Sequence, residues 1–259
     1  MNEIRIDVGK GAAARSIAVI ERKARRGNKL PGVVWLGGYR SDMQGTKAQA
    51  IDAWCERKGV AFLRHDYSGH GASSGDFRDG TISRWVEESV AVFNRFAKGP
   101  QVVIGSSMGG WIALRMAREL EKRGKRLHAM LLIAPAPDFT ERLMWPRLSE
   151  AQQAIILNDG ALEEPSQYSS EPDIFTRALF EDGRRNLVLT GEVVTHCPVH
   201  ILQGRLDPDV PWTHAMALAN QLVHESVSMT LVPDGDHRLS RPQDIELMLD
   251  ALGKLVEAS

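Results

Sequence analysis

The order of apolar and amphipathic segments along the 259-residue chain predicts an α/β fold built on a mostly parallel, doubly wound sheet. Short apolar runs, which are typical of strands buried on both faces, recur along the chain. Longer segments with apolar residues at helical spacing lie between them, and this alternation implies parallel strands. The predicted buried strands are residues 33–36, 61–63, 102–104, 130–133, 199–202 and 229–232.

The other elements agree with this fold. Residues 4–8 and 16–20 flank a Gly-Lys-Gly turn at residues 9–11, which predicts a β-hairpin at the start of the chain. Helical spacing of apolar residues marks the segments 48–55, 85–96, 109–120 and 242–255. Each of these helices follows a predicted strand, as a doubly wound sheet requires.

One stretch interrupts the alternation, because residues 136–197 contain no convincing buried strand. Helical patches at 149–157 and 174–180 and turn-forming residues at 158–160 and 181–183 indicate a helical insertion. We therefore expect one domain over residues 1–259, with residues 136–197 inserted into it as a helical lid.

Composition excludes several classes of function. Lys plus Arg number 32 and Asp plus Glu number 33, so the net charge of −1 supplies no field that would favour nucleic acid or anionic lipid. The apolar runs are far shorter than the roughly 20 residues of a membrane-spanning helix.

Cys55 and Cys197 are expected to be reduced, buried thiols. Residues 1–30 lack a signal-peptide pattern, so we expect a cytoplasmic protein.

The sharpest local motif is a G-x-S-x-G sequence at residues 105–109, directly after a predicted strand and before a predicted helix. Glycines are needed there because the central serine lies in a strained turn, where flanking side chains would clash with the backbone. The turn exposes Ser107 above the sheet, at the helix N-terminus, where an oxyanion would be stabilised. The alternative interpretation is a glycine-rich turn without chemistry.

A serine nucleophile needs a base and a carboxylate that orients the base, and on this fold they follow the serine in the order acid, then histidine. Asp207 comes just after the strand at 199–202, where sites form in open α/β sheets, and is the predicted acid. Asp209, two residues further on, is its competitor. His237 follows the last strand and is the predicted general base, because the other seven histidines precede that strand.

An oxyanion hole needs two backbone N–H groups. Met108, the residue after the serine, supplies the first, and the glycine-containing loop after the strand at 33–36 makes Tyr39 the candidate for the second. A tight strand-to-helix turn without this role is the alternative for Tyr39.

These motifs together resemble those of the α/β-hydrolases. The segments that carry the likeness are residues 37–48, 66–69, 105–111, 210–212 and 236–238. Within that family the chain is similar to the subgroup of mitochondrial palmitoyl-protein thioesterases, also described as mycophenolic acid acyl-glucuronide esterases. The resemblance implies an α/β-hydrolase fold, a catalytic triad of Ser107, Asp207 and His237, and ester or thioester substrates.

Other patterns favour neither a cofactor nor a metal. The glycines of residues 69–75 have the wrong spacing for a dinucleotide fingerprint, and His224-Glu225 lacks the second histidine of a zinc motif. Arg40 is either a partner for a substrate carboxylate or a solvated side chain. Five aromatic residues of the insertion either line an acyl pocket or pack inside the lid: Phe139, Trp145, Tyr168, Phe175 and Phe180.

The sequence thus predicts a cofactor-free serine hydrolase that acts on small-molecule or acyl-protein esters or thioesters through an acyl-enzyme. Two alternatives remain: an acyltransferase with the same triad, and a non-catalytic binding protein with this fold. Acyl chain length, the choice of ester or thioester, and the oligomeric state are left open.

Overall fold

The protein, described here by a computed structural model for residues 3–166 and 172–258, contains an eight-stranded sheet in the order β1-β2-β4-β3-β5-β6-β9-β10. The first two strands are antiparallel to their neighbours, and all later pairs are parallel. The strands are β1 (Glu3–Val8), β2 (Arg15–Arg22), β3 (Gly32–Leu36), β4 (Phe62–His65), β5 (Gln101–Ser106), β6 (Ala129–Ile133), β9 (Val199–Gly204) and β10 (Val227–Val232). The predicted N-terminal hairpin and mostly parallel sheet are confirmed.

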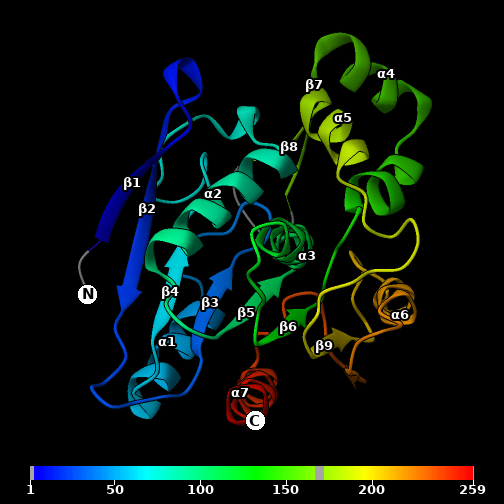
Figure 1. Ribbon diagram of the computed structural model, residues 1–259. Coiled ribbons are helices and arrows are strands. Elements are labelled where there is room, and N and C mark those ends of the chain that lie inside the picture. The colour runs from blue at the N-terminus through cyan, green and yellow to red at the C-terminus, as the bar shows by residue number, and fades with distance from the viewer. Residues whose placement is uncertain (1–2, 167–171, 259) are drawn as a thin grey trace.

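Helices cover both faces of the sheet (Figure 1). One apolar core joins the sheet to α2, α3 and α6, and a second joins it to α1 and α7. The doubly wound architecture therefore follows from strands that are apolar on both faces. The helices are α1 (Thr46–Lys58), α2 (Ile82–Phe96), α3 (Met108–Glu121), α6 (Trp212–Gln221) and α7 (Pro242–Glu257).

The insertion between β6 and β9 lies beyond the carboxyl ends of the central strands (Figure 1). It is mainly helical, as expected, with a π-helix (Thr140–Met144), a 3-10 turn (Trp145–Arg147), α4 (Glu150–Asp159) and α5 (Arg177–Arg185). The start of α4 is set by a capping box, in which Ser149 and Gln152 bond each other's backbone N–H.

The predicted helix at 174–180 is wrong in its first half. Residues Asp173–Thr176 form strand β8, which pairs antiparallel with β7 (Ala161–Glu164), and the helix begins only at Arg177. The side chain of Thr176 accepts a hydrogen bond from the N–H of Leu179 and so caps α5. The β-branched and aromatic residues before this cap suit a strand, and pairing with the preceding strand β7 decides the outcome.

Two carboxylates hold the insertion in place, one by joining its two ends and the other by joining it to the main body. Asp138, whose side chain is fully buried, accepts hydrogen bonds of 2.8 Å from the N–H groups of Val188 and Leu189, and so joins the two ends of the insertion. Asp182 on α5 accepts bonds from the N–H and hydroxyl of Ser83 in the first turn of α2. The insertion is therefore held by buried polar contacts at its base.

A buried ion pair joins the antiparallel edge of the sheet to α2. The side chain of Glu88, 0% exposed, accepts a 2.6 Å bond from Arg15 Nε and also bonds Ser68 in the loop after β4. The neighbouring Glu87 also pairs with Arg15 at 2.6 Å, but its side chain is 58% exposed.

We predict that Glu88→Gln lowers the free energy of unfolding by about 3–5 kcal/mol, because it leaves the guanidinium of Arg15 buried without its main countercharge. Glu87→Gln removes a solvent-screened partner of the same arginine and should cost less than about 1 kcal/mol. Equilibrium urea unfolding followed by tryptophan fluorescence compares the two variants. Equal losses would contradict this account of the pair.

Candidate active site

Ser107 lies in the sharp turn between β5 and α3. Its backbone has φ of 55° and ψ of −120°, a strained conformation that only a well-packed surrounding maintains in a residue other than glycine. The N–H of Ser107 donates a 2.9 Å bond to the carbonyl of Ile133 on β6. This turn raises the hydroxyl above the carboxyl end of the sheet, where the sequence predicted it.

The glycines of the motif are required by close packing. A Cβ atom on Gly109 would lie 2.1 Å from the carbonyl oxygen of Leu36 on β3, and one on Gly105 would lie 2.4 Å from the carbonyl oxygen of Gly109. Both distances are far below van der Waals contact, so no side chain fits at either position. The first turn of α3 can therefore pack directly against the end of β3.

His237 lies on the loop after β10, between the other two predicted side chains. Its Nε2 is 3.0 Å from the hydroxyl oxygen of Ser107, and its Nδ1 is 2.8 Å from Oδ2 of Asp207. An ionised carboxylate only accepts hydrogen bonds, so Nδ1 carries the proton and Nε2 is left to accept from the serine hydroxyl. His237 is 130 positions from Ser107 in the chain and 30 from Asp207, and the structure joins the three residues by one continuous set of hydrogen bonds.

Asp207 is held by four hydrogen bonds, and its side chain is 0% exposed. Besides His237, it accepts bonds from the backbone N–H groups of Asp209 and Val210 at 2.9 and 2.8 Å and from Nε2 of Gln203 at 3.2 Å. Gln203 was not predicted from the sequence. The feature of the sequence that could have identified it is a polar residue in an otherwise apolar strand, because a buried amide needs hydrogen-bond partners.

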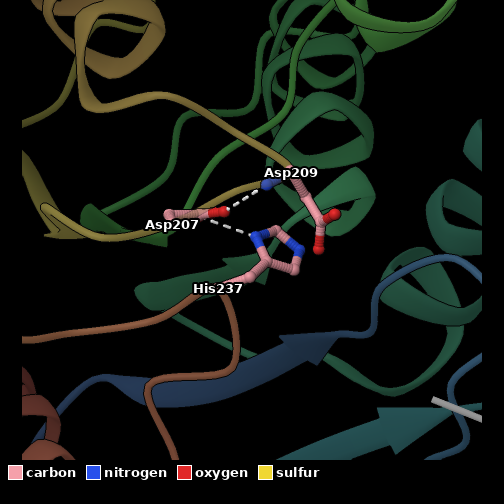
Figure 2. Close-up of side chains that lie close together, drawn as sticks. All are labelled: Asp207, Asp209 and His237. Atoms are coloured by element: carbon pink, nitrogen blue, oxygen red, sulfur yellow. Dashed lines mark hydrogen bonds and ion pairs between the residues drawn. The ribbon is translucent and has the colours of Figure 1, made fainter. Parts of the chain in front are cut away.

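Asp209 lies beside the same imidazole, as Figure 2 shows. Single ligand atoms from Asp207, Asp209 and His237 lie within 4.8 Å of one another, a spacing that suits a metal site. However, the four hydrogen bonds to Asp207 already use the acceptor positions of its carboxylate. The geometry thus favours Asp207 as the partner of the imidazole and gives a cation no open position on that carboxylate.

The loop after β3 runs beside the serine. A Cβ atom on Gly38 would lie 3.4 Å from Cβ of Ser107, so the backbone at Tyr39 is close to the hydroxyl. Within the described residues, the N–H groups of Tyr39 and Met108 donate to no other protein group. The phenol of Tyr39 donates to the carbonyl of Ile174 on β8, and its ring stacks on Phe175 at 5.8 Å. Burial raises the pKa of Tyr39 well above its ordinary value, so the phenol stays a donor.

Ser107, His237 and Tyr39 open into a cavity of about 690 Å³ between the sheet and the insertion. One wall is apolar and is formed mainly by the insertion, with Phe139, Leu143, Met144, Leu148 and Phe175. Charged residues of both signs line the remainder: Arg40, Lys47, Arg147, Arg238, Asp42, Glu164, Asp173 and Asp209. The cavity thus combines an apolar region with a polar, balanced rim.

The aromatic residues of the insertion divide between the two expected roles. Phe139 and Phe175 line the cavity, whereas the ring of Trp145 packs on that of Phe180 with centroids 5.1 Å apart. Tyr168 lies outside the described residues. Arg40 is not a solvated side chain, because it is only 17% exposed, lies 3.8 Å from Asp173 and covers the ring of Phe77.

Three further expectations concern the rest of the chain. Cys55 and Cys197 are both free and buried, as predicted. The glycines at 69–75 lie in loop structure between β4 and the 3-10 turn Phe77–Asp79, rather than in a strand-to-helix turn. In the part of the chain that the structure describes, no helix combines the length and apolar character that crossing a membrane requires.

Comparison with known proteins shows the family of this chain. The sequence profile of the alpha/beta hydrolase family matches residues 33–246. The mouse protein named "Palmitoyl-protein thioesterase ABHD10, mitochondrial" is 32% identical over 230 residues, which are 88% of this chain and 76% of the mouse protein. The likeness to this subgroup that the motifs implied is therefore confirmed.

Solved structures of hydrolases also resemble this chain. A protein from Agrobacterium vitis S4 that is described as a hydrolase is 53% identical, with a TM-score of 0.96 and 99% of both chains covered. Mouse alpha/beta hydrolase domain-containing protein 10 is 28% identical, with a TM-score of 0.84 and 98% of both chains covered. With the family profile spanning most of its length and these relatives covering nearly all of it, the chain belongs to the α/β-hydrolase family.

Proposed function

We propose that this α/β-hydrolase is a serine hydrolase that cleaves carboxylic esters or thioesters through an acyl-enzyme on Ser107. The observation that carries the proposal is the unbroken set of hydrogen bonds from Ser107 through His237 to Asp207. A hydroxyl that donates to an imidazole, itself oriented by a buried carboxylate, is the arrangement that makes serine a nucleophile at neutral pH.

In the proposed mechanism, Oγ of Ser107 attacks the substrate carbonyl while Nε2 of His237 takes its proton. The N–H groups of Tyr39 and Met108 stabilise the oxyanion, and Asp207 stabilises the imidazolium. The imidazolium then protonates the leaving alcohol or thiol, and an acyl-serine remains. Water, deprotonated by His237, attacks this acyl group and releases a carboxylic acid and free Ser107.

The cavity supports an acyl chain as the recognised part of the substrate. Its apolar wall, with Phe139, Leu143 and Phe175 among its residues, offers a surface for hydrocarbon beside Ser107. The palmitoyl-protein thioesterase names of the relatives support a thioester with a long chain. We propose that residues 136–197 act as the lid of this cavity within a single domain. A cytoplasmic location stays a prediction.

We predict that Ser107→Ala lowers kcat/KM by on the order of 10⁴-fold or more, because the members of a triad act as a unit. Ser106→Ala is the matched control, since it removes the adjacent hydroxyl of the same motif and should have a far smaller effect. Hydrolysis of a chromogenic short-chain ester measures both. Turnover retained in Ser107→Ala would overturn the proposed function.

The two neighbouring aspartates make a second paired test. Asp207→Asn should lower kcat by about 10³- to 10⁴-fold, because an amide at this position no longer stabilises the imidazolium or sets its tautomer. Asp209→Asn leaves the bond between Asp207 and Nδ1 of His237 in place and should cost less than about tenfold. Steady-state kinetics on one ester distinguishes them. A larger loss in Asp209→Asn would assign the acid to that residue.

The substrate class is tested with matched acyl esters and acyl thioesters of increasing chain length, each with wild-type enzyme and Ser107→Ala. We expect Ser107-dependent turnover that rises with chain length, because the apolar wall gains contact with each methylene. Adding an alcohol or amine acceptor and analysing the products distinguishes hydrolysis from acyl transfer. Absence of turnover on every substrate would favour a binding protein.

A further inference from the structure

A buried histidine outside the triad contacts the loop that carries the second oxyanion donor. Nε2 of His70 lies 3.2 Å from the backbone nitrogen of Arg40, the residue after Tyr39. Arg40 has φ of 55°, so this side-chain-bearing residue occupies the left-handed region that normally favours glycine. Such a conformation is strained and persists only where neighbouring contacts hold it.

The two partners of His70 select one protonation state. Nδ1 lies 3.2 Å from the carbonyl oxygen of Ser68, which only accepts, whereas the N–H of Arg40 only donates. The ring must therefore be neutral, with its proton on Nδ1 and its lone pair on Nε2 facing the Arg40 N–H. The opposite tautomer would place two donors against each other at one nitrogen and two acceptors at the other.

The surroundings of His70 keep the ring in that state. The residue is 5% exposed, and the rings of Tyr67, Phe77 and Trp85 surround it with centroids 5.0 to 5.5 Å away. Burial, together with the positive charge of Arg40, lowers the pKa of His70 to about 4, while the bond to Ser68 acts in the opposite direction. Near neutral pH the imidazole is consequently a fixed acceptor.

The same aromatic cluster holds the loop before and after Tyr39. The phenol of Tyr67 donates a 3.2 Å bond to the carbonyl of Gly37, and the ring of Tyr39 packs against Phe77 at 4.9 Å. His70 adds the bond on the other side of Tyr39, at Arg40. The loop backbone is thus held at Arg40, directly after Tyr39, and at Gly37, two residues before it.

We propose that His70 is a positioning residue that, as a neutral acceptor, holds the Tyr39–Arg40 backbone so that the Tyr39 N–H points at the oxyanion formed on attack by Ser107. This inference rests on the proposed function, because it assigns His70 to the transition state of that reaction. His70 does not touch the substrate. Its effect should therefore fall on kcat and leave KM nearly unchanged.

The test compares His70→Phe, which removes the acceptor, with His70→Gln, whose amide oxygen can restore it. We expect His70→Phe to lower kcat by about 10- to 100-fold, part of the loss seen when an oxyanion donor is removed outright. The kcat of His70→Gln should lie within about fivefold of the wild-type value.

The control is His65→Phe, since His65 is also buried and packs on Tyr67 but bonds Ser89 instead of the loop. Thermal unfolding of each variant establishes that it is folded.

A second measurement uses the wild-type protein. The ¹⁵N chemical shifts of the His70 ring should report a proton on Nδ1 and none on Nε2 near neutral pH. An Nε2–H tautomer, an unchanged kcat in His70→Phe, a His70→Gln variant as slow as His70→Phe, or an equal loss in His65→Phe would each overturn the proposal. Activity retained in Ser107→Ala would instead overturn the proposed function, so the two failures are distinguishable.

Discussion

The close approach of α3 to β3 at Gly109 is the constraint on which the site depends. With 2.1 Å between a hypothetical Cβ at Gly109 and the carbonyl of Leu36, only a glycine lets the helix begin so near the neighbouring strand. That approach brings the strained turn at Ser107 beside the loop at Gly38 and Tyr39. A nucleophile from one strand end and a backbone donor from another can then face the same carbonyl group of a substrate.

Two histidines of this protein show how partners decide what an imidazole does. His237 lies between a buried carboxylate and a hydroxyl, so it can accept a proton on one side while a negative charge stabilises it on the other. His70 lies between a carbonyl and an N–H among aromatic rings, where burial favours the neutral form. The first arrangement suits proton transfer, and the second suits holding the backbone in place.

The insertion connects the loop beside the reacting groups to the wall of the cavity that would hold the substrate. Its base is tied down by the buried carboxylates of Asp138 and Asp182, and its strand β8 accepts a bond from the phenol of Tyr39. Tyr39 thus belongs at once to the loop beside Ser107 and to the contact with the insertion. The wall that faces the cavity and the backbone beside the serine are consequently parts of one connected structure.

Much of this protein was predictable from local pattern. Apolar runs at the right intervals determined the buried strands, and glycine spacing around Ser107 determined the strained turn, because both depend on neighbours close in the sequence. The same patterns placed Asp207 and His237 at strand ends on the same edge of the sheet. The strand at Asp173–Thr176 was missed, because its conformation depends on pairing with Ala161–Glu164 and not on its own short pattern alone.

The sequence by itself determined the order of the elements, the doubly wound class and the residues of the candidate triad. Only the tertiary structure decided that Asp207 bonds Nδ1 of the imidazole, that Gln203 supports that carboxylate, and that His70 faces the Arg40 N–H. The physical reason is that hydrogen bonds depend on distance and direction between atoms. Those quantities are set by how separate strands and loops pack together, and spacing along a single chain does not contain them.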